Sequence, residues 1–296
     1  MQIIRTPVAA PIGADDLILD IETTGLSREH SHVFLIGTQS ASELVQWMSD
    51  TDDEEGALLE AALPTLSDRR VVTFNGDGFD LPFLSARALG HGLALPPYES
   101  VDLYAFLRAH RAFFRYPDLK LQTIEAQEGL LRDHGPSGAE VAAWASQRRH
   151  ADVAEKLLAH NAADVRATAA LLPAYARWQE TLHIPAPDAM LEELLIHGDH
   201  ATATYLTKEA AMPEVFFTTS FGTVEWRAKA LIVDVPVHRI PFEGETRIAA
   251  VSPSYQRDPA TPPLPAPFLT LHEPAGHVAS AVHAILRDLL PADFQS

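Results

Sequence analysis

The sequence predicts an α/β protein with a mixed sheet flanked by helices, followed by a small α+β appendage towards the C-terminal end. Short apolar runs dominate the chain up to residue 74, helical periodicity then dominates almost to residue 180, and strand-like runs return between residues 213 and 251. Strands that come first and then alternate with helices are typical of a sheet that contains both parallel and antiparallel pairs.

The first part of the chain supplies most of the predicted sheet. Its expected strands are short and apolar: residues 16–21, 32–38, 44–48 and 71–74. Its expected helices follow a helical period: residues 52–66 and 79–89. After a further short strand near Val101, we expect helices almost to residue 180.

The pattern changes at the Ile-Pro-Ala-Pro run of residues 184–187. Beyond it, alternating and β-branched runs predict three strands: residues 215–219, 223–233 and 246–251. An amphipathic helix is expected over residues 276–290. The sequence thus predicts two domains, residues 1–183 and a small strand-rich region of unknown role at residues 184–296.

The charge of the chain limits its function. Its 296 residues contain 22 Lys and Arg but 40 Asp and Glu, a net charge of −18. Such a chain repels polyanions at long range, which argues against a large nucleic-acid footprint but permits a small site. The absence of cysteine excludes disulfides and thiol catalysis. We see neither a signal peptide nor a membrane span, and expect a cytoplasmic protein.

The first chemical motif is the run DIETTG at residues 20–25. Residues two apart in a strand point to the same face, so Asp20 and Glu22 project together. Two neighbouring carboxylates repel each other, and a divalent cation between them removes the repulsion. The alternative is that both acids are solvated at the end of a strand.

Two later motifs carry further acids. Asp80 begins the helix expected after the glycine-containing turn at residues 75–78, where it could instead favour the helix dipole. His160 and Asp164 are four residues apart and share one helix face. A histidine beside a metal-binding carboxylate can take a proton from water, although such a pair can also be an ordinary surface pair.

Together and in this order, the three motifs resemble the DEDD superfamily of 3′→5′ exonucleases, which share the ribonuclease H-like fold. Asp20 and Glu22 match its first motif, Asp80 its second and Asp164 its third. The nearest branch is that of the YprB-type ribonuclease H-like domains, because residues 101–103, 119–125 and 160–161 also fit it. The resemblance covers about residues 17–175.

The resemblance implies a metal-dependent 3′→5′ exonuclease that releases nucleoside 5′-monophosphates from single-stranded ends. Two divalent cations, Mg²⁺ or Mn²⁺, would be held by Asp20, Glu22, Asp80 and Asp164. His160 would act as the base or orient water. One group of the superfamily has tyrosine four residues before the last aspartate and another has histidine five before. This chain combines the spacing of the first group with the residue of the second.

Further residues are candidates for substrate binding. By resemblance, Thr23, Thr24 and Leu26 would contact the terminal nucleotide, although Leu26 could simply pack in the core. Asn75 could touch the terminal sugar or phosphate, or only shape its turn. A basic strip could track phosphates, or could be a solvated helix face; its members, three of them near helical spacing, are Arg108, Arg111, Arg115 and Lys120.

Two other functions fit the same motifs. One is a ribonuclease H-like endonuclease, and the other is a catalytically silent module that binds nucleic acid. The expected partner is a single-stranded nucleic acid with a free 3′ end. We expect no membrane partner, and a homo-oligomer could form through the C-terminal region.

Overall fold

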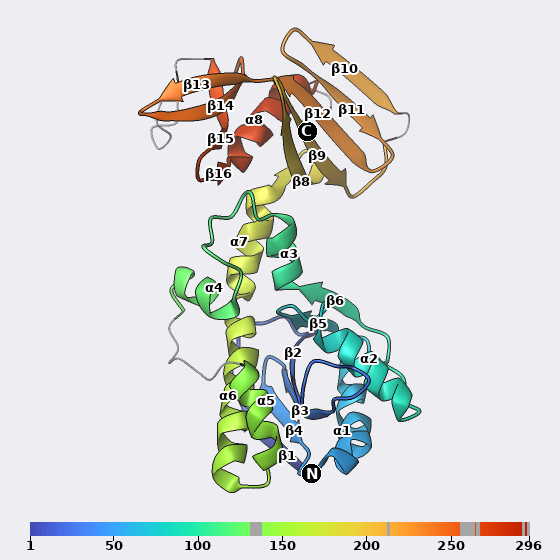
Figure 1. The fold of residues 1–296 in the computed structure, drawn as a ribbon. Helices are drawn as coiled ribbons and strands as arrows, with labels where there is room; N and C mark the ends of the chain where they lie inside the picture. The colour runs from blue at the N-terminus through green and yellow to red at the C-terminus, as the bar shows by residue number, and fades with distance from the viewer. Residues whose placement is uncertain (131–137, 212–213, 255–263, 265–266, 292–293, 295–296) are drawn as a thin grey trace. The chain divides into compact units, whose positions relative to one another are not determined.

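A computed structural model describes residues 1–130, 138–211, 214–254, 264, 267–291 and 294 (Figure 1). Two compact units divide the chain. Unit 1 contains Met1–Arg108 and Tyr116–Tyr175, whereas unit 2 contains Ala109–Arg115 and Ala176–Ser296. The predicted domain boundary between residues 183 and 184 stays a prediction.

Unit 1 is built on a six-stranded sheet with the order β1-β4-β3-β2-β5-β6. Its strands are β1 (Gln2–Pro7), β2 (Asp16–Thr23), β3 (Val33–Gln39), β4 (Glu43–Met48), β5 (Arg70–Thr73) and β6 (Glu99–Asp102). The pairs β1–β4, β4–β3 and β3–β2 are antiparallel, while β2–β5 and β5–β6 are parallel. The predicted mixed sheet is confirmed, with β2 between its antiparallel and parallel parts.

Helices cover both faces of this sheet. They are α1 (Glu55–Ala62), α2 (Asp80–Gly90), α3 (Leu103–Ala109), α4 (Leu121–Gln127), α5 (Gly138–Trp144) and α6 (Ala151–Ala170), with short 3-10 turns η1 (Asp52–Glu54), η2 (Leu63–Leu66) and η3 (Ala145–Gln147). α1 and α2 pack on one face and α5 and α6 on the other (Figure 1). The predicted helix over residues 52–66 is confirmed as η1, α1 and η2.

The alternation of β2 decides which of its side chains meet which layer. Leu17, Leu19 and Ile21 are buried among the apolar residues of α1 and α2. The intervening residues, including Asp20 and Glu22, therefore face the α6 side. α6 itself packs against β2 and β3.

Two features of unit 1 differ from expectation. β1 was not predicted, because its short run carries a proline and pairs only as an edge strand. The expected helical stretch to residue 180 is wrong over residues 110–120, where α3 has ended and α4 has not begun. Pro117 lies in this interval and disfavours helix at the residue before it.

Unit 2 contains two antiparallel sheets. The larger has the order β10-β11-β12-β9-β8-β7, and its strands are β7 (His183–Pro185), β8 (Asp188–His197), β9 (His200–Thr207), β10 (Val215–Thr219), β11 (Gly222–Arg227) and β12 (Ala230–Pro236). The smaller contains β13 (His238–Phe242), β14 (Glu245–Val251), β15 (Phe268–Glu273) and β16 (Gly276–His277). The predicted C-terminal helix is confirmed as α8 (Ala279–Leu289), and α7 (Leu172–Leu182) contains the point where the chain enters unit 2.

The single strand predicted over residues 223–233 is wrong. A tight turn, with Ala228 at a φ of 46°, divides this run into β11 and β12. Both strands have strand-like composition, so the pattern does not reveal the turn. In the described residues, no helix is both long and apolar enough to cross a membrane.

Candidate active site

Four acidic side chains of unit 1 lie close enough to act on one another electrostatically, and we call them the acidic site: Asp20, Glu22, Asp80 and Asp164. Two of them come from β2, one from the start of α2 and one from α6. The chain separates them by up to 144 residues (164 − 20). Their approach therefore depends on the packing of three elements.

Asp80 is tied directly to β2. Its Oδ1 accepts a hydrogen bond of 3.0 Å from the main-chain N–H of Ile21, the residue between Asp20 and Glu22. Asp80 is the first residue of α2 and is only 7% exposed. The predicted start of this helix is confirmed, and the side chain is fixed against the strand instead of capping the helix.

The turn before α2 brings Asp80 to this position. Asn75 has a φ of 71°, the left-handed conformation that asparagine tolerates better than most residues. At Gly76 a Cβ atom would lie 2.4 Å from the side chain of Thr73, so only glycine fits there. The side chain of Asn75 is exposed, and turn geometry is an adequate account of this residue.

Asp102 holds the same turn from the end of β6. Its Oδ1 accepts hydrogen bonds from the main-chain N–H groups of Asn75 (2.8 Å) and Tyr104 (2.9 Å), and its Oδ2 accepts one from Asp77 (3.0 Å). One buried carboxylate thus joins the turn before α2 to the first turn of α3. We assigned Asp102 no role beforehand, although an acid between a strand and a helix is a capping signal.

α6 carries the remaining residues of the site. His160 Nε2 lies 3.6 Å from Glu22 Oε1 and 3.5 Å from Asp164 Oδ2. The side chain of His160 is 9% exposed, which excludes an ordinary surface pair with Asp164. Asn161, the next residue, is fully buried and donates a hydrogen bond of 2.8 Å to Asp20 Oδ2.

Burial and mutual repulsion act together on the acids. Burial raises the pKa of Asp20 well above its usual range, and the other three carboxylates of the site raise it further. The pKa of Glu22 is raised by burial and then by Asp164 and Asp80. Burial also raises the pKa of Asp80 to about 7, against the hydrogen bond from Ile21. Burial and repulsion therefore both disfavour the charged forms of Asp20, Glu22 and Asp80.

The donor set suits a hard divalent cation, since carboxylate oxygens are the ligands that Mg²⁺ and Mn²⁺ prefer. A cation would remove the repulsion that raises the pKa values of these acids. In the part of the chain that the structure describes, no three or more acidic or histidine side chains already form a complete ligand set, so a cation would have to draw the four carboxylates together.

The last residue of β2 and the loop after it carry three predicted substrate residues, Thr23, Thr24 and Leu26. Thr23 Oγ1 donates a hydrogen bond of 2.8 Å to the main-chain oxygen of Gly25, and Thr24 Oγ1 accepts one of 2.9 Å from the N–H of His32. Both hydroxyls thus shape the loop. Leu26 is 85% exposed, which excludes the core-packing interpretation of this residue.

Sequence reasoning missed Arg28 in the same loop. Its Nη2 donates a hydrogen bond of 3.0 Å to the main-chain oxygen of Gly78, in the turn before Asp80. Arg28 is exposed and connects the loop that follows the β2 acids to the turn that precedes Asp80. In the sequence, the only indication of a role for Arg28 is that a basic residue lies close to the DIETTG motif.

The predicted basic strip does not lie on one helix. α3 ends at Ala109, so Arg108 is on its last turn whereas Arg111 and Arg115 follow it in the segment that belongs to unit 2. Arg115 forms an ion pair with Glu273 there. Lys120 is an exposed residue of unit 1, directly before α4. The helical spacing of the three arginines was misleading because α3 ends at Ala109, before Arg111 and Arg115.

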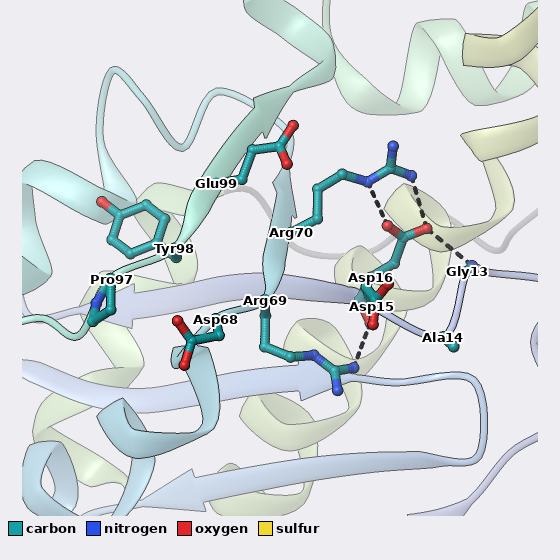
Figure 2. A pocket seen from close by; sticks show the side chains of 10 residues that line it. All are labelled: Gly13, Ala14, Asp15, Asp16, Asp68, Arg69, Arg70, Pro97, Tyr98 and Glu99. Atoms are coloured by element: carbon teal, nitrogen blue, oxygen red, sulfur yellow. Dashed lines mark hydrogen bonds and ion pairs between the residues drawn. The ribbon is translucent and has the colours of Figure 1, made fainter.

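A cavity of about 620 Å³ lies elsewhere in unit 1 and contains none of the four acids (Figure 2). Its lining residues are Gly13, Ala14, Asp15, Asp16, Asp68, Arg69, Arg70, Pro97, Tyr98 and Glu99. β2, β5 and β6 all begin here, whereas ligands of α/β sheets bind at the carboxyl ends of strands. Arg70 binds both oxygens of Asp16, at 2.5 and 3.0 Å, so part of the charge in this cavity is already paired.

A family model described as the RNase_H superfamily matches residues 17–175, more than half of the chain. The chain therefore belongs to the RNase_H superfamily. The predicted ribonuclease H-like fold of this region is confirmed. A search of curated proteins finds no match for the chain.

Several solved structures are similar at low identity. Escherichia coli exonuclease I in complex with a dT13 oligonucleotide is 12% identical with a TM-score of 0.39, and the match covers 65% of this chain and 55% of that chain. Brucella melitensis NrnC with bound Mg²⁺ is 14% identical with a TM-score of 0.29, over 56% of this chain and 86% of that chain. The match thus spans little more than half of exonuclease I, and similarity at this level concerns the fold alone.

Proposed function

We propose that the chain is a metal-dependent 3′→5′ exonuclease of the DEDD superfamily, in the YprB-type branch, acting on single-stranded ends. The observation that supports this most is the approach of Asp20, Glu22, Asp80 and Asp164 from three separate elements, with raised pKa values at the first three. Buried carboxylates that repel one another are costly to the fold, which suggests that they are kept for cation binding.

Two divalent cations, Mg²⁺ or Mn²⁺, would be held by the four carboxylates and would stabilise the attacking and leaving oxygens of a phosphodiester. His160 lies beside Glu22 and Asp164, where its imidazole can take a proton from the attacking water or orient that water. The product of this hydrolysis would be a nucleoside 5′-monophosphate.

The loop after β2 supplies the proposed contacts to the substrate. Leu26 presents an exposed apolar side chain that can pack against a terminal base, and Arg28 offers a cation for a phosphate. Thr23, Thr24 and Asn75 would contribute through main-chain groups of their turns, since the threonine hydroxyls already take part in the loop. Arg108 and Lys120 remain candidates for longer substrates.

The decisive experiment digests 5′-end-labelled single-stranded DNA and RNA with Mg²⁺ or Mn²⁺. We expect a ladder that shortens from the 3′ end and releases mononucleotides. An Asp20→Ala protein, purified identically, should be inactive. Equal digestion by both proteins would mean that the activity is a contaminant. Discrete internal cuts would favour the endonuclease, and binding without any cleavage would favour the silent module.

Self-association through residues 184–296 stays a prediction. Three large apolar side chains, Leu195, Leu206 and Phe216, are at least 40% exposed, on β8, β9 and β10. The strand registers place all three on the same face of the larger sheet of unit 2. Light scattering of the purified protein, compared with a Phe216→Ser variant, tests whether this face joins two copies.

A further inference from the structure

One cross-strand row of unit 1 joins the acidic site to the middle of the sheet. Asp20 on β2 is paired with Gly37 on β3, and Gly37 is paired with Gln46 on β4. All three positions face α6, and the central one has no side chain. This gap in the row is filled from α6 by the amide of Asn161.

The fit at Gly37 is close. A Cβ atom at this position would lie 2.1 Å from Oδ1 of Asn161 and 2.9 Å from its Cγ. Any other residue would displace the amide, because Asn161 is fully buried and its helix is packed against β2 and β3. The absence of a side chain at Gly37 therefore makes room for the amide of Asn161.

Hydrogen bonds determine how the amide is turned. The main-chain oxygen of Leu158 can only accept, so Gln46 must direct Nε2 towards it, at 2.8 Å. The same Nε2 also donates to Oδ1 of Asn161, at 2.8 Å. Asn161 must then direct Nδ2 towards Asp20, where it donates to Oδ2 at 2.8 Å and to the main-chain oxygen at 3.2 Å.

Both ends of this chain of hydrogen bonds include a main-chain oxygen, of Leu158 and of Asp20, which can only accept, so its direction cannot reverse. Gln46 is only 3% exposed, and no amide orientation other than the one described satisfies both ends. The Asp20 carboxylate is thus held by the Asn161 amide, which is itself fixed by the hydrogen bond from Gln46 and by its close fit over Gly37. Residues that orient a metal ligand in this way set the affinity of the metal site.

We propose that Asn161, seated over Gly37 and oriented by Gln46, is a positioning residue that fixes the Asp20 carboxylate and thereby sets the affinity of the acidic site for a divalent cation. This inference rests on the proposed function, since it requires that the acids bind a cation. It assigns Asn161 no contact with the substrate.

The test measures Mn²⁺ binding by calorimetry, without substrate, for the wild type and for Asn161→Ala. We expect the variant to bind Mn²⁺ about 10- to 100-fold more weakly. Gly37→Ala keeps every polar group but fills the space that the Asn161 amide occupies. It should weaken Mn²⁺ binding in the same way. Gln46→Met leaves Asn161 in place and should give a smaller loss. Thr168→Val, at a buried polar residue of α6 outside the row, is the matched control and should bind like the wild type.

Exonuclease kinetics supply a second measurement. Asn161→Ala should lower kcat at limiting Mn²⁺, recover most of it at saturating Mn²⁺, and leave KM for the oligonucleotide unchanged. Variants that melt at lower temperature but bind Mn²⁺ as tightly as the wild type would overturn the inference and leave the proposed function intact. A wild-type protein that binds no Mn²⁺ would overturn both.

Discussion

The main-chain N–H of Ile21 donates a hydrogen bond to the Asp80 carboxylate at 3.0 Å, so the second acidic motif is fastened to the strand that carries the first. The bond gives a hydrogen-bond partner to a buried main-chain N–H group, which would be costly to leave unpaired. It also means that Asp80 has two separable contributions, one as a hydrogen-bond acceptor and one as a negative charge.

Substitution of Asp80 separates these contributions. Asp80→Asn keeps an acceptor for Ile21 and removes a charge that burial disfavours, so the protein should be at least as stable as the wild type. Its kcat should fall on the order of 100-fold or more. Asp80→Ala should lose activity equally and also about 1–3 kcal/mol of stability, because Ile21 keeps an unpaired N–H. Thermal melts and digestion assays on both variants check this. Full activity of the Asp80→Asn protein would show that the Asp80 charge is not needed for catalysis.

Divalent cations should stabilise the fold. If Mn²⁺ binds only the folded acids, a concentration of 100 times Kd adds about 2.7 kcal/mol to the free energy of unfolding. The melting temperature should therefore rise with Mn²⁺ and fall again with a chelator. Asp164→Ala should reduce this shift, whereas Asp53→Asn, at an exposed acid of η1, should leave it unchanged. A shift that is equal in all three proteins would indicate binding elsewhere.

Leu26→Ala should affect substrate binding and not stability. The side chain is 85% exposed, so its removal should change the free energy of unfolding by less than about 0.5 kcal/mol. Loss of an apolar contact to the terminal base should raise KM. Leu58→Ala, at a fully buried leucine of α1, provides the contrast with an expected loss of about 2–5 kcal/mol. Unchanged kinetics of Leu26→Ala would argue against its proposed contact.

Glu55 gives a prediction about pH. Burial alone would raise the pKa of Glu55, but hydrogen bonds from Arg87, His91, the N–H of Val33 and His32 outweigh it and lower the pKa to about 2. An acid with a lowered pKa in the folded state stabilises the fold above its unfolded value of 4.5. This contribution is lost as the pH falls from 4.5 to about 2.

The expected contribution of Glu55 at neutral pH is about 3 kcal/mol, from 1.36 kcal/mol for each pKa unit. Glu55→Gln should lose roughly this amount at pH 7, measured by urea unfolding. The difference between the variant and the wild type should shrink as the pH approaches 2. A difference that stays constant between pH 5 and pH 2 would show that the carboxylate charge is not its source.

Much of the fold of unit 1 could be predicted because its strands are apolar and its helices have clear periods. Residues 16–21 lie in β2 as expected, and of the strand expected over residues 71–74 all but Phe74 lie in β5. β8 and β9 were not foreseen, since their alternate residues include threonine, glutamate and histidine besides the buried apolar ones. The pairing of β9 with β12 joins strands that are not consecutive in the chain, which a local pattern cannot reveal.

Spacing within one element was the reliable part of the site prediction. Asp20 and Glu22 share a face because strands alternate, and His160 and Asp164 approach each other because four residues make about one helical turn. Contacts between elements could not be predicted from local spacing. The sequence around Gly37 does not indicate that this residue makes room for Asn161, because the two come together only when α6 packs on the sheet.

Ala109–Arg115 belong to unit 2, although the chain on either side of them belongs to unit 1. Within unit 2, His277 donates its N–H to the main-chain oxygen of Ala112 at 2.7 Å, and Phe113 packs against the same histidine. During synthesis Ala112 of this segment is therefore in place 165 residues (277 − 112) before its partner His277 is added. A single cut after Tyr175 would therefore not separate the two units. A truncation there would leave Phe113 without the His277 ring that it packs against.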